Sequence, residues 1–170
     1  GFSFLNDNFI GSGRAFSASV NKSKSSLSFN VSYSNPFITE SGISQSFNLY
    51  HTKTKPGRLE LTDYVRNSSG IGMHFGHPIT DFFRMGYGLS LEHTKLIIGH
   101  YSSDEVKSFE SNYGDQHTLA EANLGFSYNT YNSGMWPSEG LNLSFSASAH
   151  RAFNESKINY YKTSASISYY

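Results

Sequence analysis

Apolar and polar residues alternate one by one along most of this chain. In residues 25–34, the apolar side chains Leu27, Phe29, Val31 and Tyr33 take every second position, with serines and an asparagine between them. Successive side chains of a β-strand point to opposite faces of the sheet, so this period of two indicates strands with one apolar and one polar face. The pattern recurs at residues 14–21, 25–34, 42–52, 64–76, 82–95, 117–131, 141–151 and 158–169.

The pattern predicts an all-β protein of about eight antiparallel meander strands, preceded by a strand stub at the start of the chain. No helical periodicity competes with it. The predicted strands cover about 8 to 14 residues, whereas a tilted membrane strand needs about 9–11 and soluble strands are often 5–6 residues long. Strand length therefore favours a transmembrane β-barrel over a soluble β-sandwich, whose strands alternate in the same way.

The polar positions are mostly Ser, Gly and Asn, which are small. Eight strands enclose a lumen that side chains normally fill, and few of these residues are bulky enough to do so. The small polar face therefore suits part of a wider, water-filled barrel. A self-closed eight-stranded barrel with binding or adhesin-like loops stays open as the alternative.

The composition agrees with a transmembrane β-barrel and argues against several other classes of protein. Only 15% of the 170 residues are charged and 16% are aromatic, against roughly 25% charged residues in a typical soluble domain. The formal net charge is zero, which does not favour nucleic-acid binding, and the chain has no cysteine for a disulfide scaffold or a thiolate metal site. No apolar run is long enough for a membrane-spanning helix, and no signal peptide is present, so we expect a mature or excised piece of a longer chain.

The connections between the predicted strands are of two kinds. One kind is compact and carries Pro or Gly beside an aromatic residue: residues 8–11, Asn35-Pro36-Phe37, residues 77–82 with Pro78, and residues 134–140 with Trp136 and Pro137. The other kind is polar and varied: residues 21–24, 52–63, 97–116 and 154–157. Outer-membrane barrels have short periplasmic turns, longer extracellular loops and aromatic girdles, so the first kind is predicted to be periplasmic, with Phe9, Phe37, Phe82 and Trp136 in a girdle.

Three charged residues, Arg84, Glu92 and Glu121, fall on the polar face and are predicted to face the lumen. We expect no catalytic, cofactor or metal site. The His74/His77 pair offers too few ligands for zinc, and no motif fixes a nucleophile beside a base among the loop residues Asp63, Asp104, Asp115, His100 and His117. The lysine clusters Lys22/Lys24 and Lys53/Lys55/Arg58 lie on the predicted outer side, where they are either solvated or in contact with lipopolysaccharide phosphates.

Four segments, in order, resemble the barrel of the BamA (bacterial surface antigen) family. Asn8-Phe9-Ile10-Gly11-Ser12-Gly13 is similar to the family's N-aromatic-aliphatic-G-T/S-G turn, and the stretch from Tyr33 to Ser44, with its Asn-Pro-Phe, is similar to the TNPYFT..DGVS turn. Asp63-Tyr64 with Gly76–Phe82 resembles DY…GFPINEY, and Gly134–Gly140 resembles RGYFPTDG. The resemblance covers nearly the whole chain, from the second to about the tenth barrel strand.

The resemblance implies part of a sixteen-stranded barrel, without catalytic activity, that folds and inserts other proteins into the bacterial outer membrane. It implies client outer-membrane proteins and assembly lipoproteins as partners, beside membrane lipids and lipopolysaccharide. The family's POTRA domains, its first and last strands and its VRGF loop motif have no counterpart in these 170 residues. No functional residue is therefore carried over.

Overall fold

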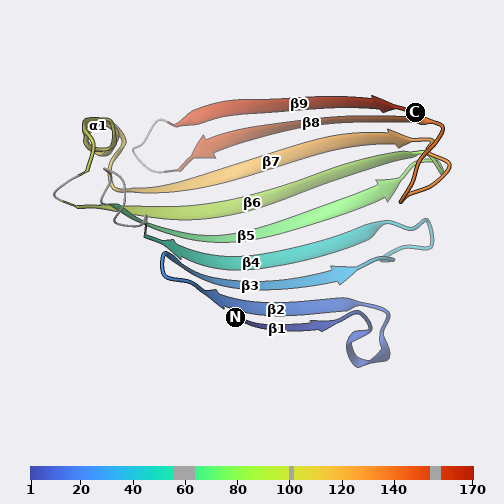
Figure 1. Cartoon of the computed structure of the whole chain (residues 1–170), viewed down its shortest axis with the longest axis horizontal. Helices are drawn as coiled ribbons and strands as arrows, with labels where there is room; N and C mark the ends of the chain where they lie inside the picture. Colours follow the sequence, from blue (N-terminus) through green and yellow to red (C-terminus); the bar gives the residue numbers. More distant parts are fainter. Residues whose placement is uncertain (56–63, 100–101, 154–157) are drawn as a thin grey trace.

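The computed structural model describes residues 1–55, 64–99, 102–153 and 158–170 of the chain. They form one nine-stranded sheet in which each strand pairs antiparallel with the next along the chain, from β1 at one edge to β9 at the other (Figure 1). The strands are β1 (Phe2–Asn6), β2 (Ala15–Lys22), β3 (Ser26–Asn35), β4 (Ser44–Thr54), β5 (Tyr64–Pro78), β6 (Phe83–Ile98), β7 (Gln116–Asn129), β8 (Leu141–Ala152) and β9 (Asn159–Tyr169). The all-β meander predicted from the alternation is confirmed, and the stub is itself a strand, paired with β2.

The register places residues of like character side by side. Val31 pairs with Leu49, and Leu49 pairs with Ile71, so these side chains share one face, which we call the apolar face. Tyr50 pairs with Gly70, and Gly70 with Glu92, on the other side, which we call the polar face. A shift of one residue would move every side chain to the opposite face, so the alternation and the register specify each other.

The sheet is a single layer without a dry interior. No apolar side chain is buried among the described residues, and large ones on the apolar face stay open, with Leu49 and Ile71 each 55% exposed. A β-sandwich would bury one face of each sheet against the other. The soluble sandwich is therefore excluded, and the apolar face is left open to contact apolar surroundings.

The two kinds of connection lie at opposite ends of the strands. The compact connections, including the short 3₁₀ turn η1 (Phe9–Gly11), lie at one end, which we call the turn end, and the polar connections lie at the other, the loop end (Figure 1). The predicted loop at residues 154–157 and the residues Arg58, Asp63 and His100 lie outside the described part of the chain.

The loop between β6 and β7 holds a feature that the sequence reading did not predict, the helix α1 (Asp104–Tyr113). The expectation that no helix is present is wrong here. Apolar residues at Val106, Phe109 and Tyr113 have helical spacing, and Gly114, at φ 83°, ends the helix by donating its N–H to the Glu110 carbonyl. In the described part of the chain α1 is the sole α-helix, and it is neither long nor apolar enough to cross a membrane.

Candidate functional site: a polar network beside helix α1

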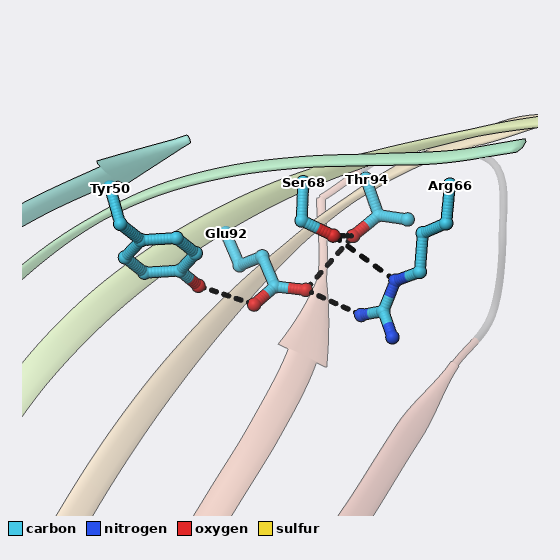
Figure 2. Close-up of polar contacts among 5 residues, drawn as sticks. All are labelled: Tyr50, Arg66, Ser68, Glu92 and Thr94. Atoms are coloured by element: carbon cyan, nitrogen blue, oxygen red, sulfur yellow. Dashed lines mark hydrogen bonds and ion pairs between the residues drawn. The ribbon is translucent and has the colours of Figure 1, made fainter. Parts of the chain in front are cut away.

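A network of five polar side chains lies on the polar face toward the loop end (Figure 2). It comprises Tyr50 of β4, Arg66 and Ser68 of β5, and Glu92 and Thr94 of β6. Their positions follow from the register, because Tyr50 and Glu92 lie in one row across Gly70, and Ser68 and Thr94 lie opposite each other in the next row. Three neighbouring strands are thus connected through side chains as well as through the backbone.

Tyr50 reaches Glu92 because the residue between them has no side chain. The Tyr50 ring lies over Gly70, where an added Cβ would come within 2.5 Å of the ring atoms. Its hydroxyl donates a hydrogen bond to Glu92 Oε2 across the full width of β5. Glycine inside a strand often marks such a close approach.

The carboxylate of Glu92 has three donors. Besides Tyr50, Thr94 Oγ1 donates to Glu92 Oε1 at 2.9 Å, and Arg66 Nη2 forms an ion pair with the same oxygen at 2.9 Å. Arg66 Nε also donates to Ser68 Oγ at 3.1 Å, and the hydroxyls of Ser68 and Thr94 are 3.0 Å apart. Ser68 and Thr94 are among the few buried side chains of the sheet. The Arg66 guanidinium therefore compensates the negative charge of Glu92, and the three donors orient its carboxylate.

Helix α1 lies beside this network and borders an open hollow together with it. Val106 and Phe109 line a cavity of about 460 Å³ together with Tyr64, Arg66, Thr94, Leu96, Glu105 and His117. The ring of Phe109 meets His117 edge-on, with 5.9 Å between ring centroids. Arg66 and Thr94 belong to both the network and the cavity wall, so the helix covers the polar face at this end of the sheet.

The first turn of α1 carries Asp104 and Glu105, where negative charge is favourable because the backbone N–H groups are unpaired. The backbone N–H of Glu105 and the hydroxyl of Ser103 hold the pKa of the Glu105 carboxyl below its ordinary value. Ser103 makes no side-chain hydrogen bond to the helix backbone. The helix start is therefore stabilised by acidic side chains.

The three charges predicted to face the lumen share the polar face. Arg84 pairs with Pro78 and Ser127 near the turn end, and Glu121 lies opposite Ser90, whose hydroxyl contacts its carboxylate at 3.4 Å. Of the three, Glu92 alone belongs to the network. The structure thus brings these charges to one face without bringing them together.

The predicted turn motifs all lie at the turn end. Asn35 Oδ1 accepts the N–H of Phe37 at 3.2 Å, which closes a turn over Pro36, and Phe37 is 73% exposed. Trp136 is 83% exposed and precedes Pro137 in the connection from β7 to β8. Their assignment to the periplasmic side remains a prediction.

The described candidates for metal ligands and acid–base groups lie at separate positions in the fold. His77 lies in β5 rather than in a turn, three residues after His74, so the two side chains point to opposite faces and cannot share a metal ion. Within the described ranges no three His, Cys, Asp or Glu side chains gather as metal ligands. Asp104 begins α1, Asp115 precedes β7, and His117 packs against Phe109, so these former candidates serve different local contacts.

Sequence reasoning missed Tyr50 and Arg66 as the partners of Glu92. The alternation gives their face, but the pairing of Tyr50 with Glu92 across Gly70 depends on the register of two strand pairs. A signal for α1 was present in the acidic residues before Val106 and in Gly114 at its end.

Comparison with known proteins places this architecture. Residues 8–170 match the Omp85 superfamily domain. The outer membrane protein assembly factor BamA of Neisseria meningitidis serogroup B is 25% identical over 167 residues, covering 91% of this chain and 20% of that protein. The crystal structure of BamA from Haemophilus ducreyi lacking POTRA domains 1–3 superposes with a TM-score of 0.75 at 21% identity, covering 97% of this chain and 33% of that one. The chain thus spans about a fifth of the length of its curated relative.

Proposed function

Because the chain belongs to the Omp85 superfamily, we propose that it is the membrane-embedded barrel region of a factor that folds and inserts β-barrel proteins into the bacterial outer membrane. Like its relatives, it is an outer-membrane β-barrel protein, and it resembles BamA. The observation that carries the proposal is the match of residues 8–170 to the superfamily domain, over a nine-stranded meander sheet. The activity acts through binding and templating, with no chemical step.

The two faces of the sheet support this assignment. Acyl chains contact the apolar face, and the polar face lines a wet lumen in which Arg84, Glu92 and Glu121 keep their charge without contact with lipid. The turn end is periplasmic and the loop end extracellular, as short and long connections are distributed in such barrels. The alternative of a self-closed barrel with adhesin-like loops has no comparable support from a protein family.

The partners proposed for this protein are client outer-membrane proteins, assembly lipoproteins, and the lipids of the membrane, including lipopolysaccharide. Client strands in transit expose unpaired backbone groups, which a barrel of this type satisfies by pairing. The nine strands described are all paired with a neighbour on the sheet, and β1 and β9 form its edges.

The proposed activity is tested by reconstitution. The protein as the cell makes it is placed in liposomes with its lipoprotein partners, and the folding of an added client barrel is followed by its protection from protease. We expect client folding above the level of empty liposomes. Folding at the level of empty liposomes, from protein that is itself inserted and folded, would refute the proposal.

The orientation is tested separately with single cysteines, since the chain has none of its own. A cysteine at Lys24, at the loop end, should react with a membrane-impermeant maleimide in intact cells, whereas a cysteine at Ser138, at the turn end, should react only after lysis. The reverse pattern would contradict the assignment of the two ends.

A further inference from the structure

Four lysines gather around one hollow at the loop end of β2, β3 and β4. Lys22, Lys24, Lys53 and Lys55 line a depression of about 220 Å³, together with Leu27 and the serines of the turn between β2 and β3. We propose that this lysine cradle binds the phosphate group of a phosphorylated lipid in the outward-facing leaflet of the membrane.

The first argument is the position of the lysines on the sheet. Lys22 pairs with Leu27, and Leu27 pairs with Lys53, so the three side chains form one row on the apolar face. The next row toward the middle of the strands consists of Val20, Phe29 and His51, of which Phe29 is 42% exposed. The rows are about 7 Å apart. Positive charge therefore lies directly above exposed apolar surface, which is the order of headgroup and acyl chain in a lipid.

The second argument is that hydrogen bonds join the backbone segments that carry the lysines. The turn is closed by the Ser23 N–H, which donates to the Ser26 carbonyl at 2.7 Å, and by the Ser23 hydroxyl, which accepts the Ser26 N–H at 3.0 Å. The Lys55 N–H donates to the Ser25 carbonyl at 2.7 Å and joins the end of β4 to this turn. The backbone thus holds the lysines together, although like charges repel one another.

The third argument is charge balance. In the described ranges the ion pair of Arg66 with Glu92 is the one salt bridge present, and it lies on the opposite face of the sheet. No described carboxylate neutralises the four lysines. An ammonium group binds phosphate as a compact charge, so a phosphorylated headgroup supplies the counter-charge that the described residues do not.

The occupant is a lipid rather than free phosphate because an inorganic anion would leave the exposed side chains of Val20 and Phe29 below the lysines without an apolar contact. The inference rests on the proposed orientation, which places the loop end at the outer leaflet. Each lysine near an anionic membrane surface contributes about a fivefold change in binding. Removal of two lysines should therefore weaken binding about 25-fold.

The test measures lipid binding to the detergent-purified protein, as the cell makes it, by native mass spectrometry. The probes are bisphosphorylated lipid A, the same lipid without its phosphates, and inorganic phosphate. We expect the wild-type protein to prefer the phosphorylated lipid, and the Lys22→Gln/Lys53→Gln variant to lose that preference. Lys22→Arg/Lys53→Arg should retain it, because the positive charge remains.

The matched control is Lys107→Gln/Lys162→Gln, which removes the same charge from α1 and from the polar face of β9. It should bind the phosphorylated lipid within twofold of wild type. Any of three results would overturn the inference. The wild-type protein could bind the two forms of lipid A equally, the Lys22→Gln/Lys53→Gln variant could bind the phosphorylated lipid as the wild type does, or millimolar inorganic phosphate could displace the lipid completely. Client folding is measured in parallel, so that failure of the lipid site can be distinguished from failure of the proposed function. The Lys22→Gln/Lys53→Gln variant should lose its lipid preference while clients still fold.

Discussion

The hydrogen bond from Tyr50 to Glu92 should matter more for stability than the ion pair from Arg66 to the same carboxylate. Tyr50→Phe removes one hydroxyl and leaves the ring over Gly70, so packing is unchanged. A hydrogen bond to a charged group contributes about 1.5–3 kcal/mol, and the lower end applies because the Glu92 side chain is 31% exposed. We expect Tyr50→Phe to lower the free energy of unfolding by about 1.5 kcal/mol.

The ion pair should contribute less, although its distance of 2.9 Å is good. The Arg66 side chain is 54% exposed, and ion pairs in contact with water contribute about 0–1 kcal/mol because solvent screens them. We therefore expect Arg66→Gln to cost less than about 1 kcal/mol. The exposure of the Arg66 side chain, rather than its charge, sets the order.

The assay is equilibrium unfolding of the protein in detergent by guanidinium chloride, with a double-mutant cycle that combines Tyr50→Phe with Glu92→Gln. The coupling energy should be about 1 kcal/mol, because each single substitution weakens the Tyr50–Glu92 hydrogen bond and the double variant loses it only once. The reasoning is refuted if Arg66→Gln costs more than Tyr50→Phe, or if the cycle shows no coupling.

Three further outcomes are expected from other parts of the sheet. Gly70→Val should displace the Tyr50 ring and so break its hydrogen bond to Glu92. In the Gly70→Val background, the same unfolding assay should show no coupling energy between Tyr50 and Glu92. Ile71→Arg, on the apolar face, should lower the free energy of unfolding by about 2–4 kcal/mol in lipid vesicles, whereas Ser90→Arg, on the polar face, should cost much less; equal costs would contradict the assignment of the faces. Glu105→Gln should increase amide exchange at the start of α1 at neutral pH. Since the folded pKa of Glu105 is depressed, its contribution is present at neutral pH and is lost as the pH falls through that pKa, so the variant and the wild type should exchange alike in acid.

The faces of this sheet were predictable because they depend on a local rule. Alternation at Phe29 and Val31 needs no knowledge of neighbouring strands, and the structure places both on the apolar face. The network was not predictable, because Glu92 meets Tyr50 through the register of two strand pairs and through the glycine between them.

Helix α1 shows a second limit of reasoning from alternation. Its ten residues have no period of two, and their helical spacing is short and lies within a long polar connection. The role of Val106 and Phe109 is visible only in the folded protein. There they line the same cavity as Tyr64 of β5 and Leu96 of β6. Tertiary packing, rather than propensity, stabilises a helix of this length.

The position of the network follows from how the strands are connected. At the turn end, β5 and β6 are joined by residues 79–82, where the Ile79 N–H and the Thr80 N–H both donate to the Phe83 carbonyl. At the loop end the connections are longer in sequence, with residues 55–63 between β4 and β5 and residues 99–115 between β6 and β7. Closing longer loops costs more chain entropy, so strand ends without short turns need other constraints. The side chains of Tyr50, Arg66 and Glu92 supply one across β4, β5 and β6. The His51–Ser69 hydrogen bond adds a second link between β4 and β5 on the other face, so side-chain contacts constrain the strand ends where a short turn would otherwise do so.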